Sequence, residues 1–258
     1  MLEYIESWVR MRALVTGNEN KTEGMQWFWR WLFYILGLAT LALGLILNTK
    51  AQLGVSPIIS VAYSTSVIAG WNFGNATLVL YVLFVIAEFI LKGKNRQWID
   101  VFQIVLSILF TRVINIFDRY INIDVTHMWQ KLLVLLAAII CTGIGAAVSV
   151  NMKFVPNPGD GIVAAVADRI HKKMGITKNI FDVGCIICTV IISLVFEHKL
   201  VGIGIGTICA MILVGRVIAL FNHFLLIPMA NVTGLAVPDQ YLDVKQLEEL
   251  DEERRFEN

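Results

Sequence analysis

The sequence predicts an all-α polytopic membrane protein with six transmembrane helices, arranged as two three-helix repeats of inverted topology. Three observations predict this class. Apolar residues make up 57% of the chain and charged residues only 16%, whereas soluble domains carry about 25% charged residues. Several apolar stretches reach the roughly 20 residues that a helix needs to cross a bilayer. A polar, helix-breaking segment then interrupts the pattern twice, at residues 54–57 and at residues 154–161.

The first repeat, residues 27–117, is expected to contain three spans and one short helix. The short helix follows the first break and ends near residue 69, so it is too short to cross and is expected to be interfacial or re-entrant. Trp27, Trp29 and Trp31 are expected to form an interfacial aromatic belt. The three spans are expected at residues 28–48, 75–91 and 98–117.

The second repeat, residues 127–224, follows an outer connecting loop at residues 118–126 and has the same order. A short amphipathic helix is expected at residues 161–173, directly after the second break. Pro228 is expected to end the last helix. The three spans are expected at residues 128–150, 179–196 and 200–224.

The charge distribution predicts that both termini are cytoplasmic. Residues 1–26 are expected to form a cytoplasmic segment with a surface helix at 2–14, and residues 225–258 a charged cytoplasmic tail. With six spans, most lysines and arginines fall on the inner side, as the positive-inside rule requires. The outer segments hold only Lys50, Arg119, Lys131 and Lys199.

The two halves align residue by residue. The segments around Arg112 and Arg216 match, and the same offset pairs Asn75 with Asn179. A slightly shorter offset pairs Pro57 with Pro158 and Gly44 with Gly145. Three spans per unit make the halves enter the membrane in opposite directions, which is common in secondary transporters with a site at the repeat interface. The same symmetry is compatible with a channel or a scaffold.

The chain resembles the YczE/YyaS/YitT-type family of bacterial membrane proteins over roughly residues 30–222. The residues that carry the resemblance are Leu-Gly-Val-Ser-Pro at 53–57, Asn-Pro-Gly-Asp-Gly-Ile at 157–162 and Gly-Ile-Gly-Ile-Gly-Thr at 202–207. Family members show an acidic residue at both breaks. Here the first break lacks it, whereas the second keeps Asp160 and Gly161. The resemblance implies a bacterial plasma-membrane location and places the emphasis on the second break.

A ligand site is expected at the interface of the two repeats. Asp160 is expected either to cap the following helix, or to bind a cation or proton in a cavity, or to pair with Arg216. Arg112 and Arg216 are expected either to extend toward the membrane interface or to face the bundle and hold an anionic group. The candidate ligand-binding residues are Pro158, Gly159, Asp160, Arg216, Ser56 and Arg112.

Other polar features receive structural interpretations. Asn179 and Asp182 resemble a capping box, and Glu88 is expected to pair with Lys92 one turn later. The glycines at 202, 204 and 206 are expected to allow tight packing rather than phosphate binding. The CxxC pair Cys185 and Cys188 is interpreted as small apolar helix residues.

The predicted function is transport of a small polar solute or ion across the bilayer. No catalytic constellation, metal spacing or nucleotide motif is found, so we expect a non-enzyme without catalytic residues, metal or cofactor. The near-zero net charge predicts no nucleic-acid partner, and a homodimer is left open. One alternative is a non-transporting scaffold or regulator of a membrane-associated enzyme. Another is a substrate-binding membrane subunit of an ATPase-coupled transporter.

Overall fold

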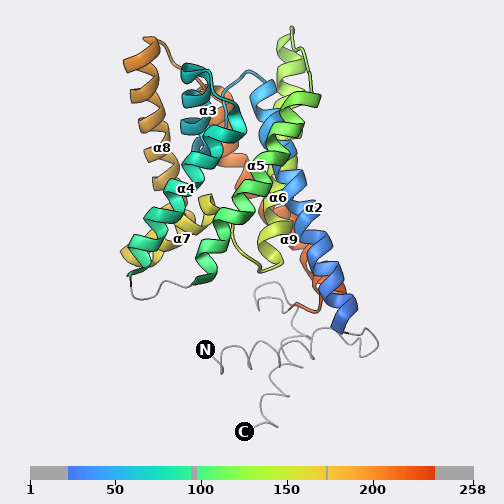
Figure 1. Cartoon of the computed structure of the whole chain (residues 1–258). Helices are drawn as coiled ribbons and strands as arrows, with labels where there is room; N and C mark the ends of the chain where they lie inside the picture. The colour runs from blue at the N-terminus through green and yellow to red at the C-terminus, as the bar shows by residue number, and fades with distance from the viewer. Residues whose placement is uncertain (1–22, 94–97, 173, 236–258) are drawn as a thin grey trace.

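The computed structural model describes residues 23–93, 98–172 and 174–235, and all regular secondary structure in this part of the chain is helical (Figure 1). The predicted surface helix at 2–14 and most of the charged tail lie outside the described residues. The first half contains α2 (Glu23–Lys50), α3 (Pro57–Ala69), α4 (Phe73–Lys92), the 3-10 helix η2 (Trp98–Val101) and α5 (Phe102–Tyr120). The second half contains α6 (Met128–Asn151), α7 (Pro158–Ile170), α8 (Met174–Glu197) and α9 (Ile205–Thr233).

Five described helices are long and apolar enough to cross a membrane, namely α2, α4, α6, α8 and α9. They make the chain a multi-pass membrane protein. The expected third span corresponds to α5, which is 19 residues long but is not among the five. Three charged residues, Arg112, Asp118 and Arg119, lie within it.

Several predicted helix boundaries are wrong. α2 begins at Glu23 rather than 28, and α9 begins at Ile205 rather than 200. α7 begins at Pro158 rather than 161 because Asn157 is the residue that caps it, and α8 begins at Met174 rather than 179. α9 does not end at Pro228 but continues through it to Thr233. The last turns are held by packing, because Leu226, Met229 and Ala230 are buried in a cluster with Tyr34 and Met152.

Helices α2 and α6 form the axis of the bundle and run antiparallel in close contact. Glycines allow this approach: a Cβ atom on Gly145 would lie 2.7 Å from the Cα of Leu41, and one on Gly44 would lie 2.5 Å from the backbone N of Thr142. Small residues at a helix interface let the backbones approach, which is how membrane helices gain packing energy.

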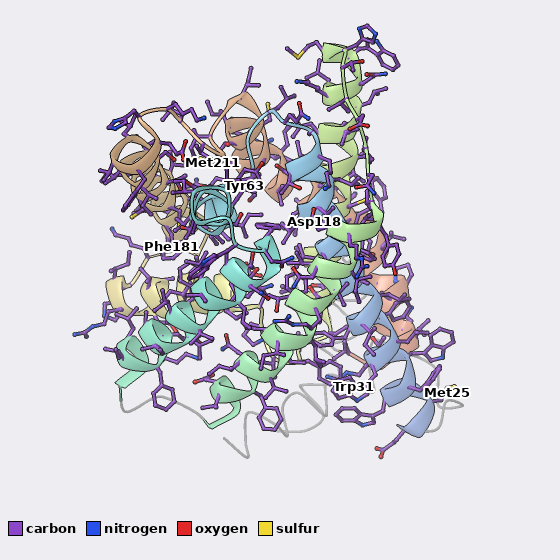
Figure 2. The ribbon with its side chains drawn as sticks, turned by 45° about the horizontal axis from the view of Figure 1, so that its top comes forward. Met25, Trp31, Tyr63, Asp118, Phe181 and Met211 are labelled. Carbon is purple, nitrogen blue, oxygen red and sulfur yellow. The ribbon has the colours of Figure 1, made fainter. Side chains whose placement is uncertain are left out.

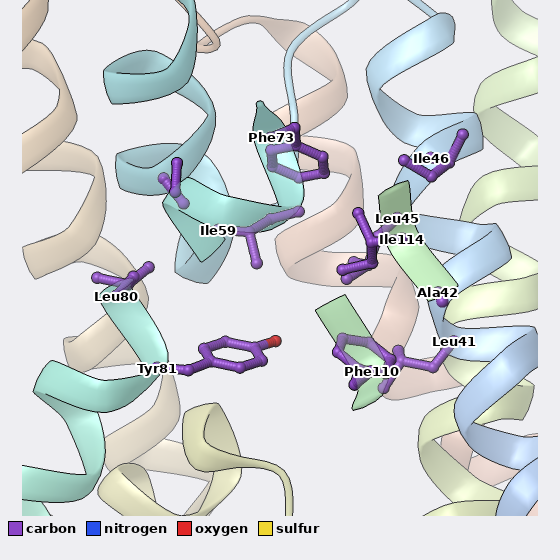
Figure 3. Packing of buried hydrophobic residues seen from close by; sticks show 12 residues of the cluster. Leu41, Ala42, Leu45, Ile46, Ile59, Phe73, Leu80, Tyr81, Phe110 and Ile114 are labelled. Atoms are coloured by element: carbon purple, nitrogen blue, oxygen red, sulfur yellow. The ribbon is translucent and has the colours of Figure 1, made fainter. Parts of the chain in front are cut away.

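The remaining helices pack around this axis. α5 and α9 lie against α2 and α6 respectively, while α3 packs on α8 and α4 packs on α7. Buried apolar side chains from α2, α3, α4 and α5 form the largest cluster, which includes Ile46, Ile59, Phe73, Tyr81 and Phe110 (Figure 3).

The start of α2 and the end of α9 lie at the same end of the bundle, since Gly234 lies against the side chain of Gln26. We call this the near end and the opposite one the far end. The short helix α3 lies toward the far end and α7 toward the near end (Figure 1).

Candidate functional site

The two short helices begin beside one another in the middle of the bundle. Each has proline at its first position, where the missing N–H costs no helical hydrogen bond. Ile58, in the first turn of α3, comes within 3.4 Å of the position that a Cβ atom on Gly159 would occupy in α7. The structure therefore brings the predicted residues Pro158 and Gly159 of the second break to the first break.

Asp160 lies in the first turn of α7 and does not cap it. Asn157 is the cap, and its side chain accepts a hydrogen bond from the N–H of Gly159 at 3.0 Å. The nearest charges to Asp160 are Lys178 and Asp182 on α8. Burial raises the pKa of the Asp160 carboxyl, and Asp182 adds to this shift while Lys178 opposes it.

Asp182 is not part of a capping box, because α8 begins eight residues before it. Its Oδ2 instead accepts from Lys178 at 2.8 Å, one turn earlier on the same helix. Its other oxygen, Oδ1, is buried and has no hydrogen-bond partner in the described part of the chain. Asp160, Lys178 and Asp182 thus form a charged group between α7 and α8.

Tyr81 connects this group to the centre of the bundle. The ring is buried and points toward Phe110 (Figure 3), with the two rings nearly parallel and their centroids 6.2 Å apart. Its hydroxyl interacts with the Asn157 side chain and lies close to Asp160. A narrow cavity beside it is lined by Tyr34, Ser107, Pro156 and Pro158 among others.

The first break packs directly against the glycine-rich segment that opens α9. The N–H of Val55 donates to the carbonyl of Gly202 at 2.9 Å, and that of Gly206 donates to Leu53 at 2.7 Å. Gly54 has φ of +98° and lies against Gly204, so a side chain at this position would be strained. The predicted packing role of these glycines is confirmed. Ser56 precedes α3, but its side chain makes no capping hydrogen bond.

Two adjoining hollows open at the far end, with Thr49 and Tyr63 shared between them. One, of about 260 Å³, is lined by Trp71, Asn72 and the ion pair between Lys50 and Asp118, whose atoms are 2.8 Å apart. The other, of about 410 Å³, lies between the first break and residues 202–205. Figure 2 labels Tyr63 and Asp118 at this end of the molecule.

The near end is closed by aromatic contacts around the second break. The ring of Phe154 stacks on Trp31 with centroids 4.4 Å apart, and the Tyr34 hydroxyl donates to the carbonyl of Val155 at 2.9 Å. The side chain of Arg30 donates to the carbonyl of Met152 at 3.1 Å. Side chains from the first four turns of α2 therefore hold the segment between α6 and α7.

The two arginines of the predicted site are not brought to it. Arg112 and Arg216 are both exposed on the surface of the bundle. Neither forms an ion pair with Asp160 or with another residue of the described ranges. This placement favours the interpretation in which long side chains extend along the bundle surface to the membrane interface.

The sequence interpretation underestimated a buried polar network around Glu88. The predicted pair with Lys92 is confirmed at 2.6 Å, but Glu88 is fully buried and also accepts from Gln103 of α5. Gln103, Ser107, Thr111 and Asn115 recur every four residues along α5. That polar stripe was the signal that could have identified the inward face.

Comparisons with known proteins agree with the family resemblance. Residues 28–223 match a family of unknown function, DUF6198. The uncharacterized protein YyaS of Bacillus subtilis (strain 168) is similar to this chain, with 22% identity over 207 residues that cover 76% of this chain and 96% of YyaS. No solved structure matches. The predicted resemblance to the YczE/YyaS/YitT-type family is confirmed.

Proposed function

We propose that this chain, which belongs to the DUF6198 family, is a plasma-membrane transporter of a small polar solute. The solute site lies between two inverted repeats. It comprises the hollows at the far end and the meeting point of α3 and α7 below them.

The observation that carries this proposal is a set of contacts that exchange partners between the halves. Residues 101 positions apart are equivalent in the two halves, so Leu41 corresponds to Thr142 and Gly44 corresponds to Gly145. Leu41 contacts Gly145, and the equivalent pair, Thr142 and Gly44, is also in contact. A two-fold axis produces such paired contacts, because if residue i of one half contacts residue j of the other, the equivalents of i and j are also in contact. It supports an inverted repeat whose axis passes between α2 and α6.

A second set of contacts supports the same axis. The same shift converts Ile58 into Gly159, and these two residues touch each other, as equivalent positions do on a two-fold axis. It also converts the pair Ser60–Thr189 into the pair Gly161–Glu88, and both pairs are in contact. In this register α4 and α8 begin 101 residues apart, at Phe73 and Met174, so it replaces the 104-residue register that paired Asn75 with Asn179. The starts of both short helices therefore lie on the proposed axis.

Transport fits this arrangement better than a static role. In inverted-repeat transporters the substrate site lies at the repeat interface beside interrupted helices, and one repeat moves against the other. Here the hollow of about 410 Å³ is lined by residues of both halves and opens to the far end, while Phe154, Trp31 and Tyr34 cover the second break from the near end. This asymmetry is that expected of a transporter open to one side.

The orientation that we propose places the near end in the cytoplasm. Both ends of the described chain lie there, and the excess of lysine and arginine in the near-end segments agrees with the positive-inside rule. In this orientation α5 also crosses the membrane, which brings the number of spans to six. The far-end hollows then face outward.

A thermal-stability screen of the full chain in detergent against pooled metabolites tests the proposal. A ligand that binds only the folded state raises its melting temperature with increasing concentration. We expect one class of small polar compound to do this in the wild type and in Arg216→Gln, whose side chain is exposed. We expect the shift to be lost in Asp118→Asn, because Asp118 lines the hollow.

The Asp118→Asn variant is expected to remain folded, so a loss of ligand binding can be assigned to the site. Asp118 and Lys50 are both partly exposed, and such ion pairs contribute about 0–1 kcal/mol, so Asp118→Asn is expected to fold. A compound found in this way is then tested by counterflow into proteoliposomes. If no compound stabilises the wild type, or if Asp118→Asn binds as tightly as Arg216→Gln, the solute site is not here.

The scaffold alternative is tested by deleting residues 238–258. A transporter is expected to keep ligand stabilisation after the deletion, whereas a scaffold that acts through its charged tail is expected to lose its partner.

A further inference from the structure

Glu88 is a carboxylate that the fold buries completely. Its exposed fraction is 0%, although it lies in α4, which is apolar enough to cross a membrane. Lys92 Nζ lies 2.6 Å from Oε1, and Gln103 Nε2 donates to both carboxylate oxygens at 3.0 and 3.1 Å. An ionisable residue placed in this way within a span is costly, so it requires a role.

The carboxylate lies directly against the first turn of α7. A Cβ atom on Gly161 would be 2.5 Å from Oε2 of Glu88 and 3.0 Å from Oε1 of Gln103. The N-terminus of a helix carries a partial positive charge that attracts anions. A negatively charged Glu88 is therefore placed to attract the start of α7, one of the two interrupted helices.

Few other charges act on Glu88 among the described residues. Lys92 is shared with Asp100 of η2, whose Oδ1 is 2.9 Å away. Asp160 is next to Gly161 in the chain, but Lys178 and Asp182 are the charges that face it. The side chain of Lys92 is 25% exposed at the near end, so its ammonium group can move into water while Glu88 stays buried.

We propose that Glu88 is a proton-binding site whose protonation releases α7. A proton from water at the near end adds to a carboxylate oxygen of Glu88 and gives a neutral carboxylic acid. After rotation of its amide, Gln103 accepts the new O–H through Oε1, which is buried and has no hydrogen-bond partner in the described part of the chain. Lys92 keeps its own proton and remains with Asp100 or moves into water.

This proposal deepens the proposed function, because it names the proton as the coupling ion. Its role in transport rests on that function. Proton binding itself does not, since it is measured without any solute, so the two can fail separately.

The first test is pH-difference infrared spectroscopy of the full chain in proteoliposomes. We expect the protonated-carboxyl band that appears at low pH in the wild type to lose one component in Glu88→Gln. The control Asp182→Asn removes another buried carboxylate that pairs with a lysine four residues away, and it is expected to keep that component. An unchanged band in Glu88→Gln overturns the proposal.

A second variant keeps the test decisive if Glu88→Gln does not fold. Lys92→Met leaves Glu88 in place but removes its cation. Because the cation beside the carboxylate is then absent, the pH dependence of the protonated-carboxyl band is expected to change. A band with the pH dependence of the wild type refutes the assignment.

The link to α7 is tested by labelling a single cysteine at position 164, with the four native cysteines replaced. At one fixed pH, Glu88→Gln is expected to label at least about three times faster than its Glu88 parent, because the neutral side chain no longer attracts the helix. Gly184→Ala, where a Cβ atom meets nothing within 4 Å, is the control and is expected to label at the parent rate. Equal rates for Glu88→Gln and its parent refute release of α7.

Discussion

The close approach of α2 and α6 predicts that Gly145→Ala is destabilising. The added Cβ atom would lie 2.7 Å from the Cα of Leu41 and 2.8 Å from the carbonyl oxygen of Gly37, whereas carbon atoms prefer about 3.5–4.0 Å. Both neighbours are backbone atoms, so the helices must move apart. Overpacking of this kind costs about 1–3 kcal/mol.

Gly215→Ala in α9 is the matched control, because a Cβ atom there meets nothing within 4 Å. Both substitutions gain the same helix propensity, up to about 1 kcal/mol, so their difference isolates the contact. Thermal melting in detergent is expected to place Gly145→Ala several degrees below Gly215→Ala, at roughly 2–4 °C per kcal/mol. The proposed repeat adds that Gly44→Ala behaves like Gly145→Ala. Equal melting of Gly145→Ala and Gly215→Ala would refute the role of this contact.

Three further predictions concern the second break and the contact between α3 and α8. Burial raises the pKa of Asp160 above its ordinary value of 3.8, so the charged form of this carboxyl destabilises the fold. The wild type is therefore expected to lose stability relative to Asp160→Asn as the pH rises above about 4. A pH-independent difference in melting temperature between the two would contradict this. Tyr34→Phe removes the hydrogen bond to Val155, and we expect a loss of about 1 kcal/mol with faster hydrogen exchange around residue 155, whereas unchanged exchange would show that the near-end closure does not depend on this bond. The hydroxyls of Ser60 and Thr189 are 2.7 Å apart, so a double-mutant cycle with Ser60→Ala and Thr189→Val is expected to give a coupling of about 0.6–1.7 kcal/mol; strictly additive melting shifts would exclude the interaction.

The helices could be predicted from the sequence because their apolar length is a local property. Their ends were less predictable where polar residues are satisfied inside a helix. Lys178 and Asp182 pair within α8, so residues 174–178, which were placed before the span, form the first turn of the helix. Asn157 and Pro158 were assigned to the break, although an asparagine before a proline is a cap followed by a first helical position.

The sequence predicted that the candidate site lies beside the breaks, but it did not predict which charged side chains face the interior of the bundle. Symmetry in the sequence identified Arg112, but the face that a residue occupies depends on packing. Thr111 is buried and its neighbour Arg112 is exposed, because successive residues of a helix point in directions about 100° apart. The burial of Glu88 depends on the approach of Gly161 from the other half of the chain, and no local pattern encodes such a contact.

The proposed repeats place different chemistry at equivalent positions, and this difference assigns them different tasks. Toward the far end, α3 meets α8 through two neutral hydroxyl pairs, Ser60–Thr189 and Ser64–Ser193. At the equivalent contact α7 meets α4 through Gly161 and the buried carboxylate of Glu88. A neutral hydrogen bond is insensitive to pH near neutrality, whereas a buried carboxylate changes its charge when it binds a proton. In a two-repeat transporter the α3–α8 contact would then serve as the fixed support, and α7 would be the element that a proton can release.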